Sequence, residues 1–142
     1  MSDQQKQISV LIVDDIPYVR KTLKQILVSH GYRVVGEAEN GDEAIRLYQE
    51  TQPDIVTMDL VMPSKNGVET TKSILKIDAD AKIVILSAMM QENLVTEAIH
   101  AGARDYIVKP FVTEEVLKVL NSVVRSGADG NSRRLQMAGG AA

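Results

Sequence analysis

The chain has no cysteine and no tryptophan, and only one phenylalanine among its 142 residues. Without cysteine it cannot form a disulfide framework or a thiolate metal site. No apolar run approaches the roughly 20 residues that a membrane-spanning helix needs. The first seven residues, "MSDQQKQ", lack the basic and apolar regions of a signal peptide. From these absences we expect a cytoplasmic protein that does not enter the membrane.

A strong charge of either sign is also missing. The 16 basic and 19 acidic residues give a net charge of -3, which provides no electrostatic attraction for nucleic acid or an anionic membrane. With 44% hydrophobic residues, the chain is long enough for one ordinary core. We expect one domain over residues 8–125, a flexible amino terminus over residues 1–7 and a disordered tail over residues 126–142, where large apolar side chains are few.

Short runs rich in Val and Ile alternate with longer amphipathic segments, a pattern typical of repeated strand and helix units. Three runs are almost entirely apolar, as in central strands of a parallel sheet: residues 8–13, 54–60 and 82–88. Two runs are more polar, as in strands nearer an edge: residues 32–38 and 104–109. The expected helices span residues 17–29, 42–51, 67–77, 92–101 and 114–125. The pattern predicts an α/β fold, a doubly wound parallel sheet of five strands with five helices.

Polar side chains stand at the carboxyl ends of four of these strands: Asp14 and Asp15, Asp59, Ser87, and Lys109. In a doubly wound fold these ends meet along one edge, where ligands bind. Each residue alone has an ordinary explanation as a helix cap, a loop hydroxyl or a solvated strand end. Together they favour a functional site, because clustered acids repel one another and need a compensating cation.

The same residue types suit the phosphorylation of a carboxylate. Asp14 and Asp15 offer the hard oxygen ligands that Mg²⁺ prefers. Asp59 can attack a phosphoryl donor and become an acyl phosphate. Mg²⁺ and the Lys109 ammonium would stabilise charge on the transferring oxygens, and the Ser87 hydroxyl can donate to one of them.

Four motifs carry a resemblance to a known family: "VDD" from Val13, "DLVMPSKNGVE" from Asp59, "LSA" from Leu86 and "YIVKPF" from Tyr106. Residues 8–125 resemble the receiver domains of two-component response regulators, most closely the single-domain chemotaxis regulators. The resemblance implies a flavodoxin-like sheet with strand order 2-1-3-4-5. The chain has Ser87 where the family often has Thr, which keeps the hydroxyl donor, and Asn66 where it often has Asp, which still suits a helix cap.

The resemblance also implies roles for individual residues. Asp59 would accept the phosphoryl group, Lys109 would pair with it, and the peptide bond before Pro110 would be cis. The implied metal ligands are the carboxylates of Asp14, Asp15 and Asp59 and the backbone carbonyl of Val61.

The implied signal is a two-state switch in which Ser87 moves toward the phosphoryl group and Tyr106 turns inward. From the residues alone, Tyr106 is also explained as an amphipathic ring on an edge strand. Met89 and Met90 are explained equally by an exposed surface for a partner or by packing under a loop. The implied partners are a cognate histidine kinase, a downstream protein that binds the Ser87/Tyr106 face, with the flagellar switch as one candidate, and a phosphatase.

Val61 and Met89 follow Asp59 and Ser87 by two residues, at positions that flank the phosphoryl group in receivers. Neither side chain can orient a water molecule, and their apolar bulk should hinder the attacking water. We therefore expect slow autodephosphorylation, with a phosphatase needed for rapid termination.

Two other classes of function stay open. One is a binding module that keeps the acidic pocket but is never phosphorylated. The other is a metal-dependent phosphohydrolase, although the haloacid dehalogenase type needs a second Asp where this chain has Val61. We expect a signalling protein rather than an enzyme, one that catalyses only phosphotransfer to Asp59 and its hydrolysis.

Overall fold

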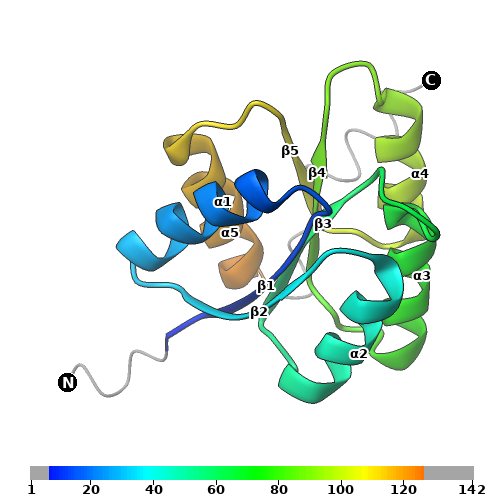
Figure 1. Ribbon diagram of the computed structural model, residues 1–142, viewed down its shortest axis with the longest axis horizontal. Helices are drawn as coiled ribbons and strands as arrows, with labels where there is room; N and C mark the ends of the chain where they lie inside the picture. The colour runs from blue at the N-terminus through cyan, green and yellow to red at the C-terminus, as the bar shows by residue number, and fades with distance from the viewer. Residues whose placement is uncertain (1–6, 127–142) are drawn as a thin grey trace.

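Five short strands form one sheet in the computed structural model, which describes residues 7–126 (Figure 1). They are β1 (Ser9–Val13), β2 (Arg33–Ala38), β3 (Ile55–Asp59), β4 (Ile83–Ser87) and β5 (Asp105–Val108). All neighbouring strands are parallel, and their order is β2-β1-β3-β4-β5. The expected fold and strand order are confirmed, with the three most apolar runs at the centre. Residues 1–6 and 127–142, which hold most of the expected flexible termini, lie outside the described residues.

Five helices connect and follow the strands. They are α1 (Pro17–Ser29), α2 (Gly41–Thr51), α3 (Gly67–Ile77), α4 (Glu92–Ala101) and α5 (Thr113–Ser126). The helices α2 and α5 begin one residue before the predicted start. In Figure 1, α1 and α5 cover one face of the sheet, and α2, α3 and α4 cover the other. None of the described helices is long and apolar enough to cross a membrane.

The alternation of side chains along β1 divides the core into two layers. Val10 and Ile12 pack with the apolar faces of α1 and α5, whereas Leu11 and Val13 pack with those of α2, α3 and α4. Every residue of β3 and β4 is buried. Each fully buried Val, Leu or Ile side chain contributes about 1.5–3 kcal/mol of transfer free energy. The buried central strands therefore hold the polar residues at their carboxyl ends in fixed positions.

Candidate functional site

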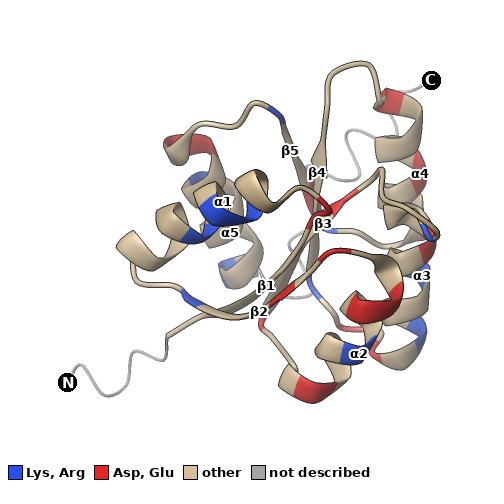
Figure 2. Ribbon diagram, in the orientation of Figure 1, with Lys and Arg blue, Asp and Glu red and all other residues tan. Residues whose placement is uncertain are grey.

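The sheet order brings the predicted polar residues to one edge. Asp14 and Asp15 follow β1, Asp59 and Ser87 end β3 and β4, and Lys109 follows β5. Carboxylate oxygens of Asp14, Asp15 and Asp59 lie within 4.8 Å of one another. Figure 2 shows the acidic segments at the ends of β1 and β3 side by side.

Lys109 supplies a positive charge inside this acidic cluster. Its Nζ donates to Asp14 Oδ2 at 2.8 Å and lies 3.4 Å from Asp59 Oδ1. The Lys109 backbone N–H donates to the carbonyl of Ser87 at 2.6 Å, and the bond to Pro110 is cis. The side chain of Lys109 is mostly buried, so its ammonium acts on both carboxylates with little screening by water.

The two acids after β1 differ in their freedom. Asp14 is fully buried, and its Oδ1 accepts a hydrogen bond from the N–H of Ile16 at 2.9 Å. The Asp14 N–H donates to the carbonyl of Ala38 on β2 at 3.0 Å. Asp15 is only half-buried. Asp14 is thus fixed in place, while Asp15 faces a site that water and ligands can reach.

Burial and charge shift the pKa of the central carboxyl group. Burial raises the pKa of Asp59 to about 6, and the negative charge of Asp14 adds to the increase. Lys109 and a hydrogen bond from the backbone N–H of Val61 oppose it. For Lys109, burial acts to lower the pKa, but the hydrogen bond to Asp14 and the charges of Asp59 and Asp14 raise it above its usual value. Near neutral pH, Asp59 is therefore mostly ionised, at a cost in free energy.

The donor set fits a magnesium ion. Three carboxylates and one ammonium leave two net negative charges when all are ionised, which matches a divalent cation. All available ligands are hard oxygens close enough to share one ion. The half-buried position of Asp15 leaves room for the water ligands that Mg²⁺ retains. The cluster can therefore hold a metal ion.

The loop after Asp59 depends on a close backbone approach. A Cβ atom on Gly67 would lie only 2.2 Å from the backbone oxygen of Asp59, so only glycine fits there. The Gly67 N–H donates to the carbonyl of Leu60 at 2.8 Å, and the side chain of Asn66 caps α3 by accepting from the N–H of Glu69. These contacts turn the loop back against β3 and leave the side chain of Val61 half exposed.

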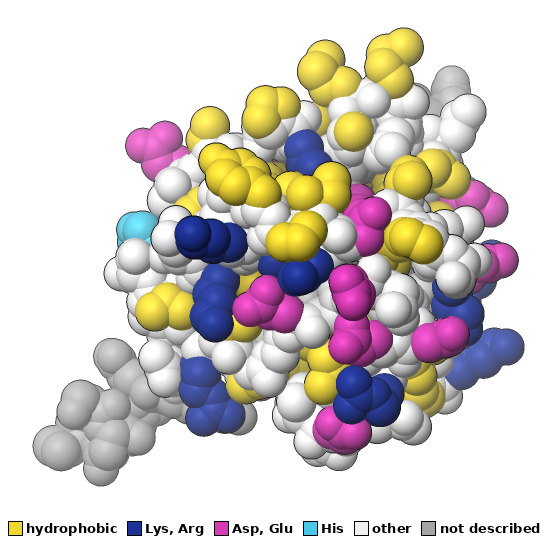
Figure 3. All heavy atoms as spheres, viewed as in Figure 1, with side chains coloured by type: hydrophobic (Ala, Val, Ile, Leu, Met, Phe, Trp, Pro, Cys, Tyr) yellow, Lys and Arg dark blue, Asp and Glu magenta, His cyan; other side chains and the backbone are white. Residues whose placement is uncertain are grey.

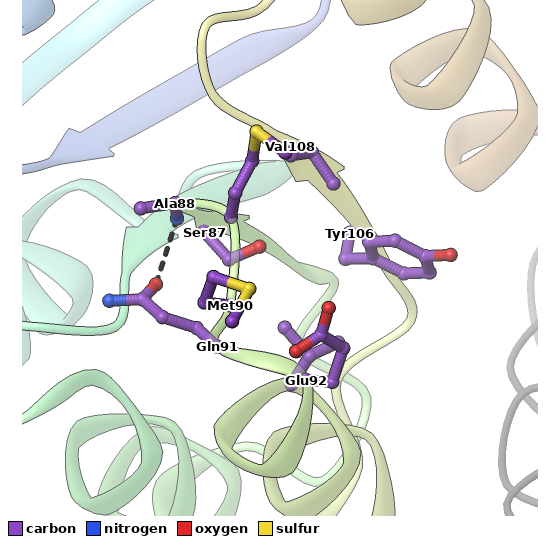
Figure 4. Close-up of a pocket in the computed structure, with 9 residues that line it drawn as sticks. Ser87, Ala88, Met90, Gln91, Glu92, Tyr106 and Val108 are labelled. Carbon is purple, nitrogen blue, oxygen red and sulfur yellow. Dashed lines mark hydrogen bonds between the residues drawn. The ribbon is translucent and has the colours of Figure 1, made fainter.

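A pocket of about 260 Å³ lies between β4, α4 and β5 (Figure 4). Ser87, Tyr106 and Val108 line it together with the loop that carries Met89 and Met90. Ser87 is buried, and in Figure 4 the Tyr106 hydroxyl points away from it. Met89 and Met90 are 70% and 86% exposed, which decides in favour of a surface and against packing under the loop.

Two residues at the site could not be identified from the sequence. The Gln91 side-chain oxygen accepts a hydrogen bond from the Ala88 N–H at 2.8 Å, which closes the loop between β4 and α4 (Figure 4). Arg20 donates from its guanidinium to the backbone carbonyl of Asp14 at 2.7 Å. A polar residue before a helix is a weak signal for Gln91, and no spacing pattern marks Arg20.

The strand order and the acidic site with its lysine define a receiver domain. Residues 10–121 match the model of the response regulator receiver domain family, and the chain belongs to that family. It is a response regulator of the two-component type, a class of signalling proteins.

Similar proteins cover almost the same length. The chain is 54% identical to the chemotaxis protein CheY of Thermotoga maritima, over 80% of this chain and 95% of that protein. It is 49% identical to CheY of Bacillus subtilis, over 81% of this chain and 96% of that protein. A chain of the CheX–CheY–BeF3–Mg²⁺ complex from Borrelia burgdorferi has a TM-score of 0.81 and 35% identity, with 87% of this chain and 93% of that chain covered.

Proposed function

We propose that this response regulator accepts a phosphoryl group on Asp59 from a histidine kinase, in a Mg²⁺-dependent reaction, and signals by phosphorylation-controlled protein binding in chemotaxis. One observation supports this most directly. The carboxylate of Asp59 lies with those of Asp14 and Asp15 in one cluster and 3.4 Å from the Lys109 ammonium. A nucleophile thus stands between a metal site and a fixed cation, as phosphoryl transfer requires.

In the transfer step, a carboxylate oxygen of Asp59 attacks the phosphorus atom of the donor. The new P–O bond makes an acyl phosphate, while the bond to the leaving group breaks. With a phosphohistidine donor the imidazole leaves and takes up a proton, and with acetyl phosphate the leaving group is acetate. A pKa of about 6 keeps Asp59 mostly ionised, and therefore nucleophilic, near neutral pH.

The ligands for the metal would be the carboxylates of Asp14, Asp15 and Asp59 and the carbonyl of Val61. When bound, Mg²⁺ supplies positive charge that stabilises the oxygens of the transferring phosphoryl group. Lys109 would contribute a second positive charge next to Asp59. Its contact with Asp59 would pass to a phosphoryl oxygen once that carboxylate is phosphorylated.

The pocket beside Ser87 supports the proposed switch. The Ser87 hydroxyl would donate to a phosphoryl oxygen, and its movement would let Tyr106 turn toward the space between them. The pocket provides that space beside the half-buried ring. The phosphoryl group would favour the inward position of Tyr106 through its contact with Ser87.

Exposed apolar side chains support protein binding at the same edge. Of the nine large hydrophobic side chains exposed among residues 7–126, seven lie at the carboxyl ends of strands, in the loops that follow or in the first turn of the next helix. They are Ile16, Tyr18, Val61, Met89, Met90, Val108 and Val112. Figure 3 shows hydrophobic side chains gathered beside the acidic ones on this face. Such a concentration next to a charged site suits transient protein contacts.

The proposed partners are a cognate histidine kinase, a downstream target at the Ser87/Tyr106 face, and a phosphatase. The flagellar switch is one candidate target, and a CheX-like protein is another, since the similar Borrelia protein forms a complex with CheX. We assign the receiver domain to residues 8–125. Phosphotransfer from a histidine kinase would occur in the cytoplasm.

The test is incubation with Mg²⁺ and acetyl phosphate, followed by measurement of the intact mass. A phosphoryl adduct in the parent protein, but not in Asp59→Asn, is expected. Release of phosphate without an adduct would favour a phosphohydrolase, and no reaction would favour an inert binding module. A pull-down that compares the phosphorylated protein with Asp59→Asn would then identify the target.

A further inference from the structure

We infer that Arg20 is a positioning residue that orients the two acids of the proposed metal site. The inference deepens the proposed function and rests on it. Arg20 lies at the start of α1, and only 16% of its side chain is exposed. Its Nη1 donates to the backbone carbonyl of Asp14 at 2.7 Å. That carbonyl belongs to the peptide unit that joins Asp14 to Asp15.

The other contacts of Asp14 show what this hydrogen bond adds. Its N–H is held by β2, and its two carboxylate oxygens accept hydrogen bonds from Ile16 and Lys109. The hydrogen bond from the Ile16 N–H closes a turn across the peptide unit between Asp14 and Asp15, but it does not engage the carbonyl oxygen of that unit. Arg20 holds this oxygen and so completes the fixation of the peptide plane and of the direction in which Asp15 leaves the strand. Its effect on the site would therefore pass through the backbone, without contact to the reacting atoms.

Glu37 holds the guanidinium in the required orientation. Arg20 Nε donates to Glu37 Oε1 at 3.1 Å, so the two ends of the guanidinium fork bind β2 and the end of β1. The second oxygen of Glu37 lies 3.6 Å from Lys24 Nζ. A guanidinium has its donors in a rigid fork, whereas the single ammonium of lysine cannot reproduce that geometry.

The sign of the effect on Mg²⁺ affinity separates positioning from simple electrostatics. Arg20 is a cation near an acidic cluster, so removal of its charge alone would strengthen the binding of another cation. If Asp14 and Asp15 instead lost their orientation, the binding of Mg²⁺ would become weaker. A role in folding alone would lower the melting temperature and leave the affinity of the folded protein unchanged.

The experiment is a Mg²⁺ titration of the full chain, followed by the NMR amide signals of Asp14, Asp15 and Asp59. Arg20→Gln removes the charge, and Arg20→Lys keeps it without the fork. The matched control is Lys24→Gln, which removes the other cation that faces Glu37. Both Arg20 variants should bind Mg²⁺ about 10-fold more weakly, as expected for outer partners of metal ligands. The control should stay within about 2-fold of the parent, because exposed ion pairs contribute little.

A kinetic measurement provides a second readout. With acetyl phosphate, the Mg²⁺ concentration for half-maximal labelling should rise about 10-fold in both Arg20 variants, while saturating Mg²⁺ restores most of the rate. Unchanged or tighter Mg²⁺ binding in Arg20→Lys would overturn the inference, as would an equal loss in Lys24→Gln. If Arg20→Gln does not fold, Arg20→Lys decides. If the parent protein itself binds no Mg²⁺, the proposed function fails together with the inference.

Discussion

Replacement of Asp59 by Asn should abolish phosphorylation and also stabilise the protein at neutral pH when Mg²⁺ is absent. The change keeps the shape of the side chain and removes its negative charge. Asp59 is only 6% exposed and lies beside the negative charge of Asp14. The pKa of Asp59 rises from 3.8 to about 6. An increase of this size corresponds to about 3 kcal/mol at neutral pH. This value already contains the attraction of Lys109, and because the amide cannot reproduce every hydrogen bond of the carboxyl group, we expect a net gain of about 1–2 kcal/mol in the free energy of unfolding.

The direction of the pH dependence follows from the same pKa. Folded Asp59 holds its proton more tightly than the unfolded chain does, so this group favours the folded state at low pH. That stability is lost as the pH rises from about 4 to about 6, between the unfolded and folded pKa values. The advantage of Asp59→Asn should therefore be small near pH 4 and reach its full size above pH 6.

Urea unfolding of parent and variant in EDTA, at several pH values, measures this difference. Asp80→Asn, at an exposed position, is the matched control for the loss of one carboxylate. Added Mg²⁺ should stabilise the parent and reduce the advantage of the variant, because a ligand that binds only the folded state adds to its stability. An Asn variant no more stable than the parent at neutral pH in EDTA would refute the reasoning.

Three further predictions test separate parts of the site and core. Lys109→Ala should still bind Mg²⁺ and accept phosphate slowly on Asp59, yet fail to bind its partner; normal pull-down of the phosphorylated variant would contradict this. Thr57→Val should raise the free energy of unfolding, measured with urea, by about 1 kcal/mol, because the buried Thr57 hydroxyl has no hydrogen-bond partner among residues 7–126; a loss of stability would argue that the hydroxyl is hydrogen-bonded. The acyl phosphate should persist in the parent after donor removal and decay faster in Val61→Asn and Met89→Glu, whose side chains can orient water. Equal decay in all three proteins would show that these positions do not set the lifetime.

Most of the fold could be predicted from the distribution of apolar residues. Runs that are almost entirely apolar became the buried strands β1, β3 and β4, because a strand covered on both faces needs no polar alternation. The more polar runs became the edge strands β2 and β5. The strand order could not be predicted in this way, because periodicity does not determine which strands are neighbours. That prediction came from the resemblance to receiver domains.

The site was predictable where polar residues end buried strands. Asp59 and Lys109 meet because parallel strands place their carboxyl ends on one edge, although 50 residues separate them. The contact of Arg20 with the Asp14 carbonyl was not predictable, since a hydrogen bond to backbone leaves no requirement for a partner side chain at a fixed spacing. The exposure of Met89 and Met90 was also undecided, because methionine packs well in cores and on binding surfaces alike.

The distribution of burial separates the parts of the site that stay fixed from those that can respond. Asp59 ends a strand in which every residue is buried, so its backbone has little room to move. The loop after Ser87 is exposed and holds Met90 at a φ of 72°, and the Ala88 N–H closes it by donating to the side-chain oxygen of Gln91. A new charge on Asp59 would therefore act from a rigid strand on a loop with few packing constraints. In the proposed switch, that asymmetry would let a local change at the acidic cluster alter the Met89 and Tyr106 surface without repacking the core.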